Sequence, residues 1–304
     1  MLKSLKEQRN RLLEKTKKIV LPGFERQNLY DVGKFYREGV KNNAASTRAA
    51  SVTFRFLLAM FPLVICIFSV IPFVPIENFQ SDILISIQEF FPPQVFLFFE
   101  EFLKDLIERK QSFLFSIGFL LTIWFASNGV NALLTAFNES YHITVYRKGI
   151  KQRLWSLGIL AMLFVFGVIV TLVTGFGQII IDFLYEKQWI TGSFAYYSIV
   201  VFKSIVSVAL FYLVISVLYN VGNPQKKEWK IFSAGATTAT ICILILKEIF
   251  ALYLTWFGNF TKLYGQLGAV IALMLFLYYL FLLILVGFEL NVSIEKAKYS
   301  GQGK

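Results

Sequence analysis

Long apolar runs, separated by short polar connections, occupy most of this 304-residue chain. A helix needs about 20 predominantly apolar residues to cross about 30 Å of hydrocarbon, and six runs reach that length. They are residues 52–73, 113–134, 154–181, 199–220, 231–254 and 265–291. The runs are continuously apolar, unlike the alternating strands of a membrane barrel, so they predict helices. We therefore expect an all-α integral membrane protein built as a six-helix bundle.

Two segments outside these runs have an amphipathic pattern. Residues 1–43 place apolar side chains among Lys and Arg, which suits either a helix lying along an anionic membrane surface or a solvated basic helix. The apolar positions are Leu5, Leu12, Leu13, Ile19 and Val20. Residues 82–109 combine apolar clusters with acidic residues and are divided by two prolines, which predicts two short amphipathic helices in the first outer loop. The expected organisation is a basic arm over 1–43, a membrane domain over 44–295 and a tail over 296–304.

The distribution of basic residues predicts the orientation of the spans. Of the 30 Lys and Arg, 22 lie in residues 1–51, in the second and fourth connections and in the segment after the last span. Five lie in the first, third and fifth connections. Cytoplasmic segments of membrane proteins carry such an excess, so we expect both termini in the cytoplasm. The net charge of +11 is spread over four segments and not gathered in one groove with aromatic residues, which argues against nucleic-acid binding.

The chain shows no pattern typical of an enzyme. Its charged fraction of 16% is below the roughly 25% of soluble domains, which disfavours a soluble catalyst. Metal-dependent hydrolases need several converging ligands, whereas His142 is the one histidine in the sequence. The nucleotide-binding pattern GxxxxGK[ST] and the serine-hydrolase pattern GxSxG do not occur. We expect no catalytic site, no cofactor and no metal.

Charged residues near the ends of the first and last spans are the first candidates for function, because charge in hydrocarbon is unfavourable unless it is paired or hydrated. Arg48 and Arg55 lie seven residues apart on one helix face. We expect Arg55 to lie near Glu289, where the arginines would bind a phosphate group at the inner leaflet. The alternative is a snorkelling arginine and an interfacial glutamate.

Further polar residues lie deeper in the spans. Lys247 and Glu248 are neighbours whose side chains leave the helix about 100° apart, so we expect one of them to line a hydrated cavity within the bundle. Lys203 is the expected partner of Glu248. Asn128 and Asn131 share one face of the second span. They would either contact a substrate or join helices by hydrogen bonds.

Several of these spans resemble the YihY/BrkB family of bacterial inner-membrane proteins. Residues 49–54 (AASVTF) and 61–63 (FPL) resemble its first span, and 121–136 (LTIWFASNGVNALLTA) its second. Residues 264–270 (YGQLGAV) and 287–291 (GFELN) resemble its last. The resemblance implies a six-helix fold in the bacterial cytoplasmic membrane. Family members have carried the labels ribonuclease BN and virulence or serum-resistance factor, and some have been connected with moving lipids or lipopolysaccharide precursors.

Together these observations predict a multi-pass inner-membrane protein that translocates, or aids the movement of, an amphipathic, lipid-like envelope substrate. The expected partners are membrane lipids, and the sequence leaves open whether the chain forms oligomers. One alternative is a scaffold that binds envelope-assembly partners without transporting anything. The other is a ribonuclease, for which the residues provide no ligand cluster.

Overall fold

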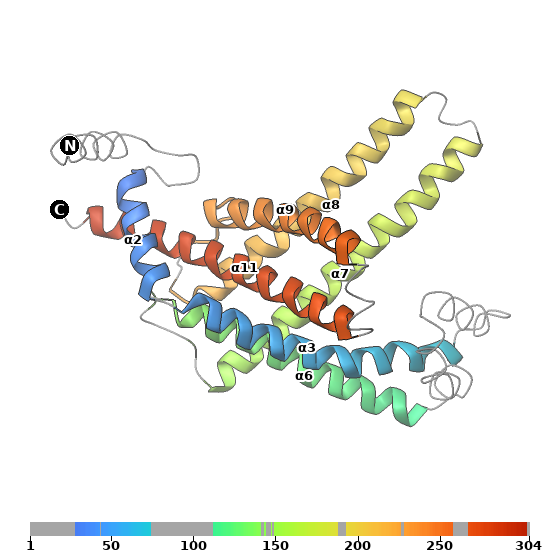
Figure 1. The fold of residues 1–304 in the computed structure, drawn as a ribbon, viewed down its shortest axis with the longest axis horizontal. Helices are drawn as coiled ribbons and strands as arrows, with labels where there is room; N and C mark the ends of the chain where they lie inside the picture. Colours follow the sequence, from blue (N-terminus) through green and yellow to red (C-terminus); the bar gives the residue numbers. More distant parts are fainter. Residues whose placement is uncertain are drawn as a thin grey trace. The chain divides into compact units, whose positions relative to one another are not determined.

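The computed structural model describes residues 28–42, 44–73, 112–140, 143, 147, 149–187, 193–225, 228–257 and 267–302. Within these residues the chain is helical and contains no strand (Figure 1). The helices are α2 (Leu29–Asn42), α3 (Ala45–Val70), the short 3₁₀ helix η1 (Ile71–Phe73), α6 (Ser112–Asn138), α7 (Gly149–Glu186), α8 (Ser193–Gly222), α9 (Ala234–Phe257) and α11 (Leu267–Gln302). The predicted all-α class is confirmed.

Among the described residues, six helices are long and apolar enough to cross a membrane: α3, α6, α7, α8, α9 and α11. Each coincides with one predicted span, so the six-span membrane fold is confirmed. Most of the helices extend beyond the apolar runs. The third predicted span, 154–181, lies within α7, and the last, 265–291, continues along α11 to Gln302. Hydrophobicity marks only the part of a helix that contacts hydrocarbon, whereas backbone hydrogen bonding continues into the polar interface.

The chain divides into two compact units. The first contains the residues up to Val52 and those from Asn131 onward, and the second contains Thr53–Val130. Helices α3 and α6 each pass from one unit into the other. The predicted outer-loop helices over 82–109 lie outside the described residues.

In the first unit, α11 packs against α9 and α2, and α8 packs against both α7 and α9 (Figure 1). A trio of aromatic side chains forms the core beside α11. The rings of Phe137 and Phe288 stack with their centroids 4.0 Å apart, and Tyr219 meets both rings edge-on. All three side chains are almost fully buried. Gly222 makes room for the trio, because a Cβ at this position would lie 2.5 Å from the Phe137 ring.

Helix α2 belongs to the predicted basic arm, of which residues 1–27 lie outside the described residues. Its start is set by Asn28, whose side chain accepts a hydrogen bond from the backbone N–H of Asp31 at 2.8 Å and donates one to the Asp31 carboxylate. Asn28 is thus the N-cap of α2. Val32 then packs against Ile294 and Ala297 of α11. The apolar stripe of α2 is therefore used for packing on another helix of the same unit.

In the second unit, parts of α3 and α6 pack closely. A Cβ added to Gly118 of α6 would lie 3.4 Å from the backbone of Cys66 in α3. A Cβ added to Gly129 of α6 would lie 2.9 Å from the ring of Phe56 in α3. Large apolar side chains such as Phe61 and Leu120 are exposed along these helices, which suits a surface in contact with lipid tails.

Candidate functional site

Five consecutive residues of α11, Gly287–Asn291, connect most elements of the first unit. Gly287 permits close approach of its neighbours, because a Cβ there would lie 2.5 Å from Tyr219 Oη and 2.8 Å from Gly235 O. Tyr219 in turn donates a 2.7 Å hydrogen bond to the backbone carbonyl of Ile284. Phe288 belongs to the aromatic trio, and Leu290 packs toward Val32. The two polar members, Glu289 and Asn291, make hydrogen bonds to neighbouring elements.

Glu289 is a buried carboxylate, with 3% of its surface exposed. The hydroxyl of Ser140, which follows the end of α6, donates a 2.8 Å hydrogen bond to Glu289 Oε2. One turn further along α11, the Ser293 hydroxyl bonds the Glu289 carbonyl. An ionised carboxylate is costly to bury unless hydrogen bonds and an opposite charge compensate for the lost hydration. Such a charge is present nearby.

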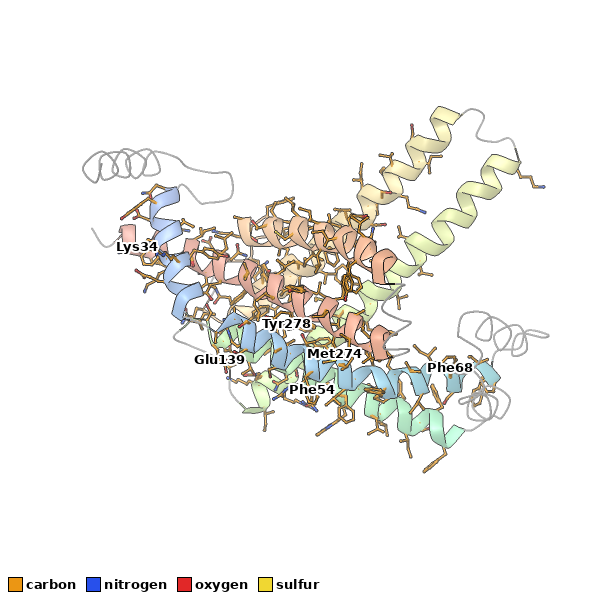
Figure 2. The ribbon with its side chains drawn as sticks, in the orientation of Figure 1. Lys34, Phe54, Phe68, Glu139, Met274 and Tyr278 are labelled. Carbon is orange, nitrogen blue, oxygen red and sulfur yellow. The ribbon has the colours of Figure 1, made fainter. Side chains whose placement is uncertain are left out.

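That opposite charge is Arg48, near the start of α3. Its guanidinium donates from Nη1 to the backbone carbonyl of Ala136, at the end of α6. It also lies within the electrostatic influence of Glu289 and Glu139. Figure 2 labels Glu139, which follows the last turn of α6, and Lys34 on α2. Arg48, seven residues before Arg55 on the same helix, is therefore the arginine that lies near Glu289 in the first unit.

Tyr36 brings a phenol from α2 to the same region. Burial raises the pKa of Tyr36 above its usual value, and the negative charge of Glu289 and the Cys242 thiol raise it further. The phenol is therefore neutral at physiological pH. We use the term "polar cluster" for Tyr36, Arg48, Ser140 and Glu289.

Asn291 fixes the crossing of α11 and α9. Its Oδ1 accepts a 2.7 Å hydrogen bond from the backbone N–H of Gly235, and its Nδ2 donates to the Ser233 hydroxyl at 3.0 Å. Ser233 is also the cap of α9, since its hydroxyl accepts from the N–H of Ala236. One amide side chain thus satisfies groups at the start of a neighbouring helix that have no partner within it.

Asn131 belongs to a second polar group, between α6 and α7. Gln152, in the first turn of α7, donates to Asn131 Oδ1 at 3.0 Å and to Thr135 Oγ1 at 2.8 Å. Asn138 donates to Gln152 Oε1 at 3.2 Å. The arrangement supports the interpretation that Asn131 joins helices, which was one of its two expected roles. Contact of Asn131 with a substrate stays a prediction.

Two predicted site residues, Arg55 and Asn128, lie in the second unit. Arg55 is exposed on α3, and Asn128 is half-buried on α6. The prediction that Arg55 meets Glu289 stays a prediction, as does a substrate contact for Asn128.

Lys247 and Glu248 form an ion pair with each other, with Lys247 Nζ 3.2 Å from a Glu248 carboxylate oxygen, and their side chains are 70% and 71% exposed. That one of them lines a hydrated cavity within the bundle stays a prediction. Their Cβ atoms diverge by about 100°, but the four methylenes of lysine are long enough to bring its ammonium back to the next residue. Lys203, on α8, is half-buried, and its role stays a prediction.

Several residues of these polar groups were not identified from the sequence. Ser140, Tyr36 and Gln152 lie outside the apolar spans, where polar residues are common and do not stand out in the sequence. For Ser140 and Gln152 the signal is their position within a few residues of a helix end, where a side chain can reach a neighbouring helix. Tyr36 lies in the middle of α2 and gives no such signal. Arg147 also lies outside the apolar spans. It donates a 2.5 Å hydrogen bond to the backbone carbonyl of Val221, and its guanidinium lies 4.4 Å from the centroid of the Trp155 ring.

The described part of the chain holds no group of three or more His, Cys, Asp or Glu side chains that could bind a metal ion. His142, the one histidine, lies outside the described residues. The polar cluster has the chemistry of ion recognition instead: a guanidinium, a carboxylate, a hydroxyl and a phenol. The expectations of no enzyme activity and no cofactor stay predictions.

Comparison with known proteins identifies relatives over most of the chain. The family described as Virulence factor BrkB matches residues 37–304. The putative ribonuclease-like protein YfkH of Bacillus subtilis is 27% identical over 83% of this chain and 90% of its own length. A UPF0761 membrane protein of Tolumonas auensis is 24% identical, covering 86% of this chain and 84% of its own. The UPF0761 membrane protein YihY of Shigella sonnei is 24% identical over 70% of this chain and 72% of its own length. No solved structure gives a significant match.

Proposed function

The chain belongs to the BrkB family of multi-pass membrane proteins, and on that premise we propose that it helps an amphipathic, phosphate-bearing lipid to cross the bilayer. The proposed location is the bacterial cytoplasmic membrane, with both termini in the cytoplasm, as the 22 basic residues in the predicted inner segments indicate. The polar cluster would then lie near the cytoplasmic end of the spans. Its substrate would be a lipid of the envelope.

The observation that carries this proposal is the state of Arg48. Its Nε is buried and has no hydrogen-bond partner within the described part of the chain. A buried donor left unsatisfied costs about 1–3 kcal/mol, more for a charged group. The planar guanidinium presents donors in a fork that matches phosphate oxygens. A phosphate headgroup reaching Arg48 would satisfy the remaining donor.

Glu289 has a defined part in this proposal. It neutralises Arg48 while no substrate is present, and the substrate phosphate takes over that role on binding. The Ser140 hydroxyl holds the carboxylate in place at 2.8 Å. Exchange between two anions keeps the arginine compensated at each stage, which avoids an isolated charge at the edge of the hydrocarbon. We propose no catalytic role for the chain; the ribonuclease-like name belongs to its relative in Bacillus subtilis.

Reconstitution into liposomes tests the proposal. Purified protein is inserted into vesicles that contain a headgroup-labelled phospholipid, and dithionite quenching measures how much label moves to the outer leaflet. Arg48→Lys keeps the charge and loses the fork, so it should slow the movement. Glu289→Gln keeps an acceptor for Ser140 and loses the negative charge, so it should also slow it.

Lys151→Ala is the matched control, because it removes a positive charge from an exposed position near the start of α7. It should move lipid as fast as the wild type. Thermal unfolding and size-exclusion profiles of each variant separate a lost site from a lost fold. Wild-type protein that moves no phospholipid above empty vesicles, or well-folded Arg48 and Glu289 variants that match the wild type, would contradict the proposal and favour a scaffold.

A further inference from the structure

The exposed ion pair on α9 is the feature that the proposed function does not use. Lys247 lies thirteen residues into α9, or about 20 Å along the helix axis. The candidate membrane span covers Ala234–Tyr253, so both charges fall within it. Each side chain is about 70% exposed and touches the other at 3.2 Å. A pair in this position faces hydrocarbon unless something covers it, and lipid tails cannot compensate for either charge.

The surface around the pair has the spacing of a helix-pairing seam. Five of the exposed residues of α9 lie at alternating intervals of three and four positions. They are Thr238, Ile241, Ile245, Glu248 and Leu252. Such spacing places side chains in one stripe that packs against an equivalent stripe of a second helix. We call these five residues, with Lys247, the α9 seam.

We propose that the α9 seam is the interface of a homodimer, in which a second copy of this chain covers the Lys247–Glu248 pair. The argument for a second copy is charge complementarity. A two-fold axis along the membrane normal brings one surface against itself, so every charge on one copy meets the same set on the other. The pair carries one positive and one negative charge. Each ammonium can therefore bridge its own Glu248 and Glu248 of the partner subunit, and four charges alternate around the axis.

A different partner protein would need its own matching pair at the same depth. A lipid headgroup would have to enter the hydrocarbon by about 9 Å from the Tyr253 end of the span to cover the pair. The second copy requires no further assumption, because the complementary charges are already present on this chain.

The proposal is independent of lipid movement and is tested on oligomeric state. Two differently tagged copies are co-expressed, and one tag is used to isolate the other from gently solubilised membranes. Wild-type copies should co-purify. Glu248→Lys gives each copy two positive charges and Lys247→Glu gives each two negative charges, so neither variant should pair with itself. The two variants should pair with each other, because their charges are opposite.

The double exchange, Lys247→Glu with Glu248→Lys, is the matched control, since it restores one charge of each sign and should restore pairing. A second measurement does not depend on reversed charges. In a chain with Cys66 and Cys242 replaced by alanine, Ile245→Cys or Leu252→Cys should form an intermolecular disulfide in oxidised membranes. Phe164→Cys, on the exposed face of α7, should not. Absent wild-type co-purification, self-pairing of both single variants, or equal cross-linking at all three positions would each overturn the proposal.

Discussion

Replacing Gly235 with alanine tests whether the close crossing of α9 and α11 holds the first unit together. The position of a Cβ on this glycine would lie 2.1 Å from the backbone oxygen of Gly287 and 2.6 Å from the Asn291 side chain. Ordinary contact begins at about 3.4 Å, so the two helices would have to separate by roughly 1 Å at this point. The nearest obstacle is backbone, which cannot move aside as a flexible side chain can.

The expected loss of stability follows from two contributions. Forcing additional volume into a packed core costs about 1–3 kcal/mol. Separation of the helices also lengthens the hydrogen bond from the Gly235 N–H to Asn291 and the bond from Asn291 to Ser233, each worth about 1 kcal/mol. Alanine favours a helix over glycine by up to about 1 kcal/mol, which offsets part of this. We expect Gly235→Ala to destabilise the protein by about 2–4 kcal/mol.

Thermal unfolding in detergent, followed by circular dichroism and by the loss of the monodisperse size-exclusion peak, measures this change. Gly158→Ala is the matched control, because a Cβ at that position in α7 has nothing within 4 Å. It should be neutral or slightly stabilising. If Gly235→Ala unfolds at the wild-type temperature, the close crossing does not exist in the protein, and the role assigned to Asn291 is wrong with it.

Two further predictions concern orientation and pH. In a chain without its native cysteines, a cysteine introduced within residues 82–109 should react with an impermeant thiol reagent added to intact spheroplasts. Lys151→Cys should react with the reagent only after the cells are lysed. The reverse pattern would refute cytoplasmic termini. The raised pKa of Tyr36 means that the folded state disfavours the phenolate. The stability of the fold should therefore be unchanged below the usual tyrosine pKa of about 10. It should fall as the pH rises toward and through the higher pKa that Tyr36 has in the folded state. The unfolding temperature of Tyr36→Phe should therefore fall less than that of the wild type between pH 9 and about pH 11. Equal falls would show that folding does not raise the pKa of Tyr36.

The six spans were predictable from sequence because one quantity determines them. Any helix that crosses the hydrocarbon must be apolar over about 20 residues, whatever it packs against. The ends of the helices were less predictable. Backbone hydrogen bonding carries α11 to Gln302 and starts α7 at Gly149, and the hydrophobic pattern has no information about those polar turns. Capping residues do have that information. Ser233 is the cap of α9 and marks its start within three positions of the start of the predicted span.

The polar contacts were predictable only in part, because they depend on which helices are neighbours. Arg48 and Glu289 stood out as charges near the ends of apolar spans, but the pairing expected from the sequence was between Arg55 and Glu289, whereas the structure places Arg48 near Glu289. Ser140 is an unremarkable serine in a polar connection until the packing brings it to Glu289. The pairing of Lys247 with Glu248 was not predictable from helix geometry alone. Their side chains leave the helix about 100° apart, but the length and flexibility of lysine bring its ammonium to the neighbouring carboxylate.

The arrangement of Gly287–Asn291 explains why simple substitutions cannot separate packing from function at this site. Along less than two turns of α11, Gly287 sets the helix crossing, Phe288 fills the core, Glu289 meets Ser140, and Asn291 caps α9. Removing any of these side chains disturbs structure and site together, so a loss of activity in an alanine variant has two explanations. Changes that keep shape and alter charge or fork geometry, such as Glu289→Gln and Arg48→Lys, preserve most of the packing. Their effect therefore reports on ion recognition, and only such variants can decide whether this turn of α11 serves transport or assembly.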